Sequence, residues 1–124
     1  MEKKNLTLIA GASDNPGRYA YLAAQTLMDH GYDFVPIGIR KGDVFGKEIL
    51  LLKDNPSIPP IDTVTLYVGP KNQPAWIDFI LKLKPRRVIF NPGTENDEFQ
   101  EILQQENIET EEACTLVLLR SGQY

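Results

Sequence analysis

The sequence predicts an α/β protein in which helices cover both faces of a doubly wound parallel sheet of about five strands. Short apolar runs rich in β-branched residues alternate along the chain with segments whose apolar residues recur every three or four positions. Such alternation is typical of parallel strands joined by right-handed helical crossovers. The length of 124 residues, with 42% hydrophobic residues, predicts one domain that spans the chain from 1 to 124.

The opening segment predicts a strand, a tight loop and a helix. Residues 6–10 are apolar and end at Gly11, a pattern typical of a central strand that is buried on both faces. Turn-forming residues follow, and we expect Asn15 among them to cap a helix. This helix carries an apolar stripe over residues 20–28, and Gly31 stands where a C-terminal cap is expected.

The middle of the chain continues the alternation. Residues 34–37 predict a second strand, in which Pro36 lacks a donor and is expected near the strand's end or at a sheet edge. Residues 42–61 contain several prolines that break any long element, and no element is predicted there. A third strand is expected over residues 64–68, followed by a helix within residues 74–85 that begins and stops at proline.

The last third predicts a strand over residues 87–90, a helix over residues 94–106 and a short strand over residues 108–110. The first turn of that helix carries three carboxylates, which suit the positive end of the helix dipole and would repel a phosphate. Periodicity leaves the tail, residues 113–119, open between strand and helix.

Composition and charge exclude several classes of partner. The formal net charge is −4, from 13 Lys+Arg against 17 Asp+Glu, which gives no general basic field for nucleic acid. No apolar stretch approaches the length of a membrane span, and the run after residue 5 is too short for a secretory signal. One histidine and one cysteine cannot build a zinc site, and a single cysteine suits a reducing cytoplasm. The oligomeric state, including a homo-oligomer, stays open.

Four loops are candidate ligand-facing segments. In a doubly wound sheet, ligands bind beyond the carboxyl ends of the strands, where the strand order reverses. Because the strands are expected to be parallel, the loops that follow them should share one edge of the sheet. Those rich in glycine, proline, asparagine or serine are residues 11–18, 38–41, 69–72 and 91–96.

The first loop has the residues of an anion site. Gly11 permits a sharp turn after the strand, Ser13 offers a hydroxyl, and the free amides at the start of the helix favour a phosphate. Arg18 adds a permanent cation that forms two parallel bonds to a phosphate. The Gly-x5-Gly spacing differs from the Gly-x-Gly-x-x-Gly of nicotinamide enzymes, however, and an ordinary turn with a solvated arginine explains the same residues.

The second loop carries a basic pair, Arg40 and Lys41, where enzymes that use NAD keep an acidic residue for the ribose diol. A basic pair favours a ribose that bears a phosphate, as in NADP or coenzyme A, whereas solvated surface charges are the alternative. In the fourth loop, Asn91, Thr94 and Asn96 suit neutral hydrogen bonds to a pantetheine amide or to neighbouring loops. Most asparagines in such loops serve only the turn.

No catalytic constellation is predicted. His30 is expected in the last turn of the first helix, where a cation suits the helix dipole. This end of the helix points away from the candidate loops. Cys114 has no second histidine to activate it, and the hydroxyl of Ser13 has no base nearby in the sequence pattern. These residues do not predict an enzyme.

Motifs spread over nearly the whole chain occur in a characteristic order. They are Gly11-Ala12-Ser13 with Arg18, Gly31-Tyr32, Val35-Pro36-Ile37, Gly46, Ile61-Asp62-Thr63-Val64 and Gly93-x-x-Asn96-x-Glu98. In this order they resemble the small single-domain CoA-binding proteins and the N-terminal domain of the succinyl-CoA synthetase alpha subunit. The resemblance implies a Rossmann-like three-layer fold that binds coenzyme A or an acyl-CoA, without a covalent bond, over the strand ends.

The resemblance also implies which residues bind the coenzyme. The positions it implies are Gly11, Ala12, Ser13 and Arg18 around the phosphates, Gly38, Arg40 and Lys41 at the phosphoribose end, Val68, Gly69 and Pro70 beside the ligand, and Asn91 and Gly93 along the pantetheine arm. The ligase chemistry of the larger relatives does not carry over, since it needs a phosphorylated histidine and a nucleotide-activating domain.

The leading hypothesis is therefore a non-catalytic module that binds coenzyme A or an acyl-CoA through a phosphate-binding loop after the first strand. Two alternatives stay open. One is an NADP-binding reductase, which the same basic pair favours. The other is an interaction subunit that binds no nucleotide.

Overall fold

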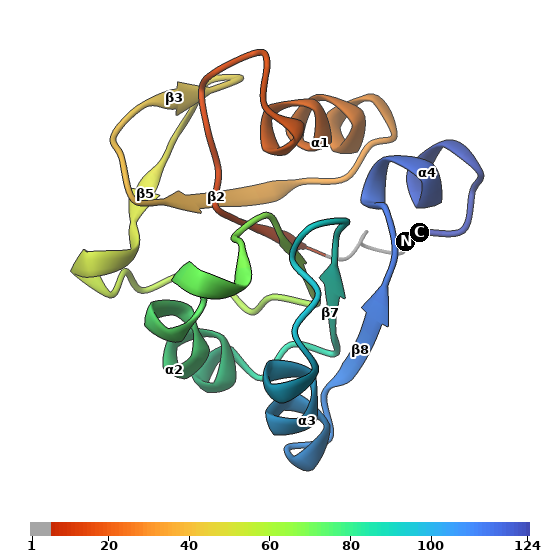
Figure 1. Ribbon diagram of the computed structural model, residues 1–124. Helices are drawn as coiled ribbons and strands as arrows, with labels where there is room; N and C mark the ends of the chain where they lie inside the picture. The colour runs from red at the N-terminus through yellow and green to blue at the C-terminus, as the bar shows by residue number, and fades with distance from the viewer. Residues whose placement is uncertain (1–5) are drawn as a thin grey trace.

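Six parallel strands form one sheet across residues 6–124, the described part of the computed structural model (Figure 1). Residues 1–5, on which the expectation about a secretory signal partly rests, lie outside the described residues. The strands of the sheet are β1 (Thr7–Ala10), β2 (Phe34–Gly38), β5 (Leu50–Leu51), β6 (Thr63–Leu66), β7 (Arg87–Phe90) and β8 (Glu109–Glu112). The helices are α1 (Tyr19–Asp29), α2 (Pro74–Leu83), α3 (Asp97–Gln105) and α4 (Thr115–Arg120), with short 3-10 turns η1 (Leu52–Asp54) and η2 (Pro70–Asn72).

The strand order of this sheet is β5-β2-β1-β6-β7-β8, and every neighbouring pair runs parallel. The chain begins in the middle with β1, extends to one side through β2 and β5, and then returns to β6 on the other side of β1. The order therefore reverses between β1 and β6, which is the switch point of a doubly wound sheet. The predicted fold class, a Rossmann-like three-layer arrangement, is confirmed.

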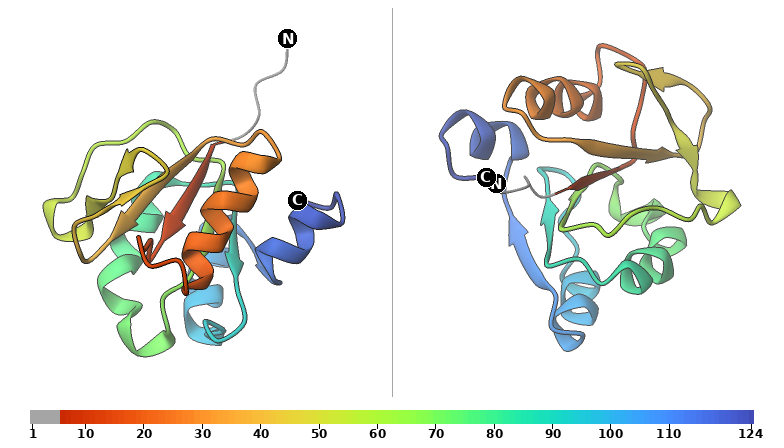
Figure 2. Two further views of the ribbon diagram at one scale, coloured as in Figure 1. Left: turned by 90° about the horizontal axis from the view of Figure 1, so that it is seen from above. Right: turned by 180° about the vertical axis from the view of Figure 1, so that it is seen from behind.

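Helices cover both faces of the sheet. In Figure 1, α1 and α4 lie above the sheet and α2 and α3 lie below it, and the two views of Figure 2 show the same layers from other sides. Below the sheet, Trp76 and Ile80 of α2 and Phe99 and Leu103 of α3 form one buried cluster with side chains of the central strands. Trp76 is only 2% exposed, so its indole belongs to this core.

The opposite face is covered mainly by α1. Ala20, Ala24 and Leu27 of this helix pack against Ile9 of β1, and Leu119 of α4 completes the cluster. The small alanine side chains let the helix lie close to the sheet, as the apolar stripe predicts. This close packing fixes where the loop between β1 and α1 leaves the sheet.

Both ends of α2 and the end of α1 are where the sequence predicts them. Pro74 is the first residue of α2, and the left-handed Lys84 (φ 48°) ends the helix just before Pro85. His30 is the C-cap of α1, and Gly31 follows it in the left-handed conformation (φ 79°). Glycine is the residue that adopts this conformation without a steric penalty.

The prediction that a helix begins at residue 94 is wrong by three residues. The N–H and the hydroxyl of Thr94 both donate to the carbonyl of Asn91, which closes a turn before the helix. The side chain of Asn96 then accepts a hydrogen bond from the N–H of Phe99 and caps α3. The tail that periodicity left open is the helix α4. Within residues 6–124, no helix reaches the length and apolarity of a membrane span.

The segment for which no element is predicted contains a hairpin and an edge strand. Strands β3 (Asp43–Val44) and β4 (Lys47–Glu48) pair antiparallel, and β5 pairs with β2 where Leu50 lies opposite Ile37. Each of these strands has two residues, too few for any periodicity to appear in the sequence. The short strand β5 is the reason that the sheet has six strands where about five are predicted.

Pro36 lies inside β2, neither at its end nor on an edge strand. The carbonyls of Asp33 and Ile37 both accept hydrogen bonds on the β1 side, so Pro36 between them faces the other side. There β5 pairs with β2 only from Ile37 onward. The missing donor of Pro36 therefore leaves no ladder hydrogen bond unmade.

We predict that Phe99→Ala lowers the free energy of unfolding by about 3–5 kcal/mol, because it empties a buried site beneath the sheet. Phe99 is 1% exposed, and its ring packs edge-on against Phe90 at 5.5 Å between centroids. Urea denaturation measures the change. Val117→Ala, at a position that is 58% exposed, is the control and should change stability by less than about 0.5 kcal/mol. Equal stability of the two variants would contradict this description of the core.

Candidate functional site

The loops that follow β1, β2, β6 and β7 meet at one edge of the sheet, because these strands are parallel neighbours. The switch point between β1 and β6 places residues 11–18 beside residues 67–73 at the centre of that edge. Open α/β sheets bind ligands at this position. The four loops selected from the sequence therefore surround the place where a ligand is expected.

The first loop is packed tightly between the ends of β2 and β6. The N–H groups of Gly11 and Ala12 both donate to the carbonyl of Ile37, each at 2.9 Å. Gly11 has a φ of 90°, and a Cβ added there would lie 3.0 Å from a methyl of Val68 and 3.1 Å from the carbonyl oxygen of Tyr67. Only glycine combines this backbone conformation with such a close approach.

The first loop also touches the second loop at two places. A Cβ added to Gly38 would lie 2.8 Å from the carbonyl oxygen of Ala12, and one added to Gly42 would lie 2.6 Å from the Asp14 carboxylate. Arg40 and Lys41 stand in the chain between these two contacts. The basic pair is thus held beside the loop that leads to Arg18.

The three cationic side chains on these loops, Arg18, Arg40 and Lys41, are all exposed. None of them forms an ion pair with an acidic residue among residues 6–124. Unpaired guanidinium and ammonium groups at the carboxyl edge of a sheet raise the local positive potential. This part of the edge favours an anionic ligand.

The prediction that Asn15 caps α1 is wrong. Asn15 instead closes a local turn, in which its N–H donates to Ser13 Oγ at 3.0 Å and its Oδ1 accepts from the N–H of Gly17 at 2.9 Å. Arg18 is the N-cap residue of α1, and no side chain accepts from the amides of the first helical turn. The N–H of Tyr21 donates to the carbonyl of Arg18 at 3.1 Å, so the N–H groups of Tyr19 and Ala20 are the ones left for an anion at the positive end of the helix dipole.

Gln73 joins the third and fourth loops, and sequence reasoning missed it. Its buried side chain donates through Nε2 to the carbonyls of Val68 (2.9 Å) and Thr94 (2.8 Å), and its Oε1 accepts from Asn96 Nδ2 (2.8 Å). One amide thus ties the end of β6 to the loop after β7. Nothing in the sequence signals this role, because a polar residue before Pro74 is an ordinary start of a helix.

Asn91 is held by the protein through both of its side-chain polar atoms. Its Nδ2 donates to Thr65 Oγ1 (2.8 Å) and the carbonyl of Leu66 (2.9 Å), and its Oδ1 accepts from the N–H of Thr115 (2.9 Å). Asn91 is 2% exposed, and its side chain is directed toward the sheet and α4. Asn91 therefore positions the loop after β7, and the groups it leaves for a ligand belong to neighbouring residues.

The remaining selected positions form the open surface of the third and fourth loops. Gly69, Pro70 and Gly93 are exposed, and Val68 is half-buried beside Gly11. A Cβ added to Gly69 or Gly93 would meet nothing within 4 Å. The backbone is thus accessible along this stretch, where a flexible ligand chain would meet little steric hindrance.

Tyr67, at the end of β6, has a buried hydroxyl that sequence reasoning did not single out. The hydroxyl has no hydrogen-bond partner among residues 6–124, because the neighbouring Thr65 and Thr115 hydroxyls bond to each other at 2.7 Å. Burial raises the pKa of Tyr67 to about 12, against the opposing effect of the two threonine hydroxyls. Tyr67 therefore stays protonated near neutral pH.

The two residues with the most reactive side chains lie on different helices, α1 and α4. His30 is at the far end of α1 from the loops, where its Nδ1 lies 2.8 Å from the carbonyl of Thr26. Cys114 is half-buried after β8, as the N-cap of α4. Among residues 6–124, no group of three histidine, cysteine or acidic side chains gathers in a way that could hold a metal ion.

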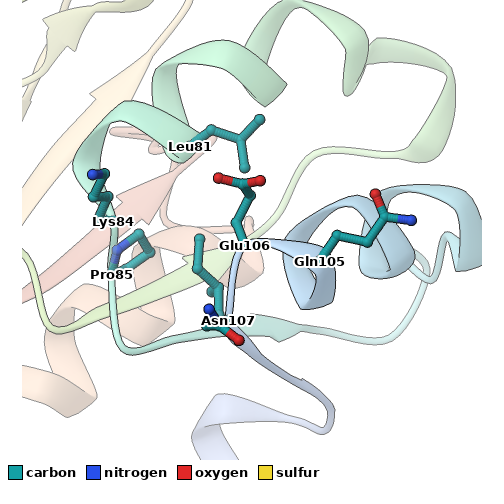
Figure 3. A pocket seen from close by; sticks show the side chains of 7 residues that line it. Leu81, Lys84, Pro85, Gln105, Glu106 and Asn107 are labelled. Atoms are coloured by element: carbon teal, nitrogen blue, oxygen red, sulfur yellow. The ribbon is translucent and has the colours of Figure 1, made fainter.

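Among the hollows on the surface of residues 6–124, two lie at opposite edges of the sheet. One, of about 350 Å³, is lined by Ile39, Leu52, Lys53 and Ala75, beside the basic pair at the loop edge. The other, of about 460 Å³, lies between the ends of α2 and α3 and includes Lys84 and Glu106 (Figure 3). The first is mostly apolar and adjoins the candidate site, whereas the second is remote from it.

Comparison with known families bears on the ligand of this fold. Residues 5–120 match the sequence model of a family described as CoA binding domain. The chain belongs to this family. Membership supports binding of coenzyme A in general, and it agrees with a cationic loop edge at the switch point of the sheet. No curated protein is significantly similar to the chain.

Solved structures share the fold of this CoA binding domain. A crystal structure of a protein described as uncharacterized is 50% identical, with a TM-score of 0.93, and the match covers 99% of this chain and 100% of that one. A hypothetical protein from Pyrococcus horikoshii OT3 is 25% identical, with a TM-score of 0.80 over 93% of this chain and 81% of that one. A protein from Thermus thermophilus, at 22% identity and a TM-score of 0.83, matches over 97% and 90%.

We predict that Gln73→Ala lowers the free energy of unfolding by about 2–4 kcal/mol, because it leaves two carbonyls and one amide without their partner. Chemical denaturation measures the loss. Gln25→Ala, at an exposed position on α1, removes the same side chain where it makes no such bonds and should change stability by less than about 0.5 kcal/mol. A Gln73 variant as stable as the Gln25 variant would show that the two loops do not depend on this amide.

We predict that Tyr67→Phe leaves the protein as stable as before, or more stable, because it removes a buried hydroxyl without a partner. The raised pKa also sets the direction of the pH dependence. The unfolded chain loses the Tyr67 proton near pH 10 and the folded chain only at about 12, so the free energy of unfolding falls as pH rises between these values. Denaturation at neutral and alkaline pH should show a smaller alkaline loss in the variant. A variant that is destabilised at neutral pH would indicate a hydrogen bond at Tyr67 Oη.

Proposed function

We propose that residues 1–124 act as one CoA-binding domain that holds coenzyme A or an acyl-CoA reversibly, without a chemical step of its own. The observation that carries the proposal is that the second loop touches the first at Gly38 and Gly42. These contacts hold Arg40 and Lys41 beside the loop that leads to Arg18. Membership in the CoA binding domain family supports coenzyme A as the ligand.

The diphosphate of the ligand is assigned to the first loop. In this proposal Gly11 and Ala12 shape the loop, since their N–H groups donate to the carbonyl of Ile37, while Ser13 offers a hydroxyl at the switch point. The amides of the first turn of α1 lack a side-chain acceptor. Arg18, as the N-cap residue, adds a charge beside those amides. Amides and a guanidinium together favour a diphosphate more than either group does alone.

The phosphate on the ribose is assigned to the second loop. Arg40 and Lys41 follow Gly38, whose lack of a side chain lets this loop touch the first one at Ala12. Coenzyme A carries a ribose phosphate that dephospho-CoA lacks, so this pair should account for the difference in affinity between the two. The apolar hollow beside Ile39 lies next to this position.

The pantetheine arm is assigned to the third and fourth loops. Val68, Gly69, Pro70 and Gly93 offer an unobstructed surface there, which suits an extended and mostly uncharged chain. In this proposal Asn91 acts by positioning the loop through its bonds to β6 and α4. The absence of a catalytic step is supported by His30, the only histidine of the sequence, which lies at the other end of α1.

Calorimetric titration with coenzyme A, dephospho-CoA and NADP tests the proposal. We predict that coenzyme A binds roughly tenfold or more tightly than dephospho-CoA, because the ribose phosphate gains charge-assisted bonds. Arg40→Ala/Lys41→Ala should weaken coenzyme A to about the level of dephospho-CoA while leaving dephospho-CoA binding nearly unchanged. Lys82→Ala, on the last turn of α2, removes an exposed charge at the opposite edge and is the matched control.

The same titration separates the proposal from its rivals. Tighter binding of NADP than of coenzyme A would favour a reductase. No heat with any of the three ligands would leave only the subunit that binds no nucleotide. A double variant that binds coenzyme A as well as the native chain would remove Arg40 and Lys41 from the site while leaving the ligand in place.

A further inference from the structure

Charge is divided unevenly along the loop edge of the sheet. Arg18, Arg40 and Lys41 follow β1 and β2, and Lys53 follows β5. Beyond β7 the pattern reverses: residues 88–119 contain no lysine, arginine or histidine and carry the acidic residues Glu95, Asp97, Glu98, Glu101, Glu106, Glu109, Glu111 and Glu112. The cationic end also carries Asp14, Asp43 and Asp54, so a ligand that lies across the edge meets charges of both signs at one end and only carboxylates at the other.

Four of these carboxylates belong to the loop edge itself. Glu95 lies in the loop after β7, where its Oε1 accepts from the N–H of Gly93 at 2.8 Å. Asp97 and Glu98 form the first turn of α3, and Glu112 ends β8 with its Oε2 accepting from Gln100 at 2.8 Å. All four are exposed, and none is ion-paired with a cation among residues 6–124.

The proposed ligand is long enough to reach this acidic end. From β1 to β8 the strand order β1-β6-β7-β8 gives three inter-strand spacings, about 14 Å. The phosphopantetheine arm has about twelve bonds between the diphosphate oxygen and the sulfur, which is about 15 Å when extended. With the phosphates held by cations beside β1 and β2, the sulfur comes to lie over the carboxyl ends of β7 and β8.

We infer that this site takes free coenzyme A and thioesters of uncharged acyl groups, and discriminates against thioesters whose acyl group ends in a carboxylate. The inference rests on the proposed function. An acyl carboxylate would extend past the sulfur toward Glu95 and Glu98, and like charges within about a Debye length repel. An uncharged acyl group pays no such penalty. Lys71, in η2 after β6, is the last cation in the loops at this edge before the acidic segment begins, whereas Arg87 lies at the opposite end of β7.

The experiment compares the dissociation constants of coenzyme A, acetyl-CoA and succinyl-CoA by calorimetry at low and at moderate salt. We predict similar values for coenzyme A and acetyl-CoA, and binding of succinyl-CoA that is about threefold to tenfold weaker at low salt. Because the charges are exposed, salt should reduce this gap. Glu95→Gln/Glu98→Gln should also reduce it, while the glutamine at 95 keeps an oxygen to accept from Gly93.

A matched variant separates the local effect from that of net charge. Glu101→Gln/Glu106→Gln removes the same charge from exposed positions nearer the other end of α3, where Glu106 lines the remote hollow in Figure 3. It should leave the gap between acetyl-CoA and succinyl-CoA nearly unchanged. Equal binding of these two thioesters, or a gap that the two variants change alike, would overturn the inference while the proposed function stands. Failure of coenzyme A itself to bind would overturn both.

Discussion

The close packing of the loop after β1 against both neighbouring strands is the constraint on which the site depends. Gly11 and Ala12 share one carbonyl of β2, while the backbone of Gly11 lies against Tyr67 and Val68 of the β6 end. Gly38 repeats the arrangement from the β2 side, against Ala12. Backbone approaches backbone at both glycines, and a methyl of Val68 packs against Gly11, so the three strand ends lie close together. A larger side chain at either glycine would force the loops apart.

The two halves of the loop edge are organised by different means. Around β1 and β2, glycines let backbones touch and leave the charged side chains of Arg18, Arg40 and Lys41 exposed. Around β6 and β7, two buried amides, those of Gln73 and Asn91, bond to loop and strand carbonyls and fix the loops in place. Satisfied buried amides of this kind rigidify a structure. The first half can therefore attract an anionic group, and the second can present a fixed surface to a neutral one.

The elements that could be predicted from the sequence are those with a periodic pattern of apolar residues. The central strands and α1 and α2 bury continuous stripes, so their positions follow from the pattern. The hairpin β3–β4 and the strand β5 each bury one side chain, Val44 and Leu51, and two-residue strands leave no period to detect. The start of α3 was misplaced because Thr94 bonds back to Asn91 in a local turn after β7, which apolar periodicity does not reveal.

The loops of the candidate site were predictable from the sequence, but the buried amides that hold these loops in place were not. Topology alone assigns the four loops to one edge, and the basic pair is visible in the sequence. The role of Gln73 depends on the carbonyls of Val68 and Thr94 arriving at one place, which only the folded chain arranges. The sequence left Asn91 open between a ligand and neighbouring loops, since an asparagine in a turn looks the same whether its amide faces outward or into the sheet. Burial decides between these, and burial is not local in sequence.

The spacing of the first loop gives a reason for an arginine at position 18 in the proposed phosphate site. In a Gly-x-Gly-x-x-Gly loop the helix opens within the motif, so its amides approach the phosphates directly. Here the local turn at Ser13 and Asn15 lengthens the connection, and α1 begins only at Tyr19, eight residues after Gly11. A later helix start sets its amides back from the switch point and weakens their field there. Arg18 is the N-cap residue of this helix and carries a full positive charge. Its guanidinium therefore offsets the loss of positive potential that results from the later helix start.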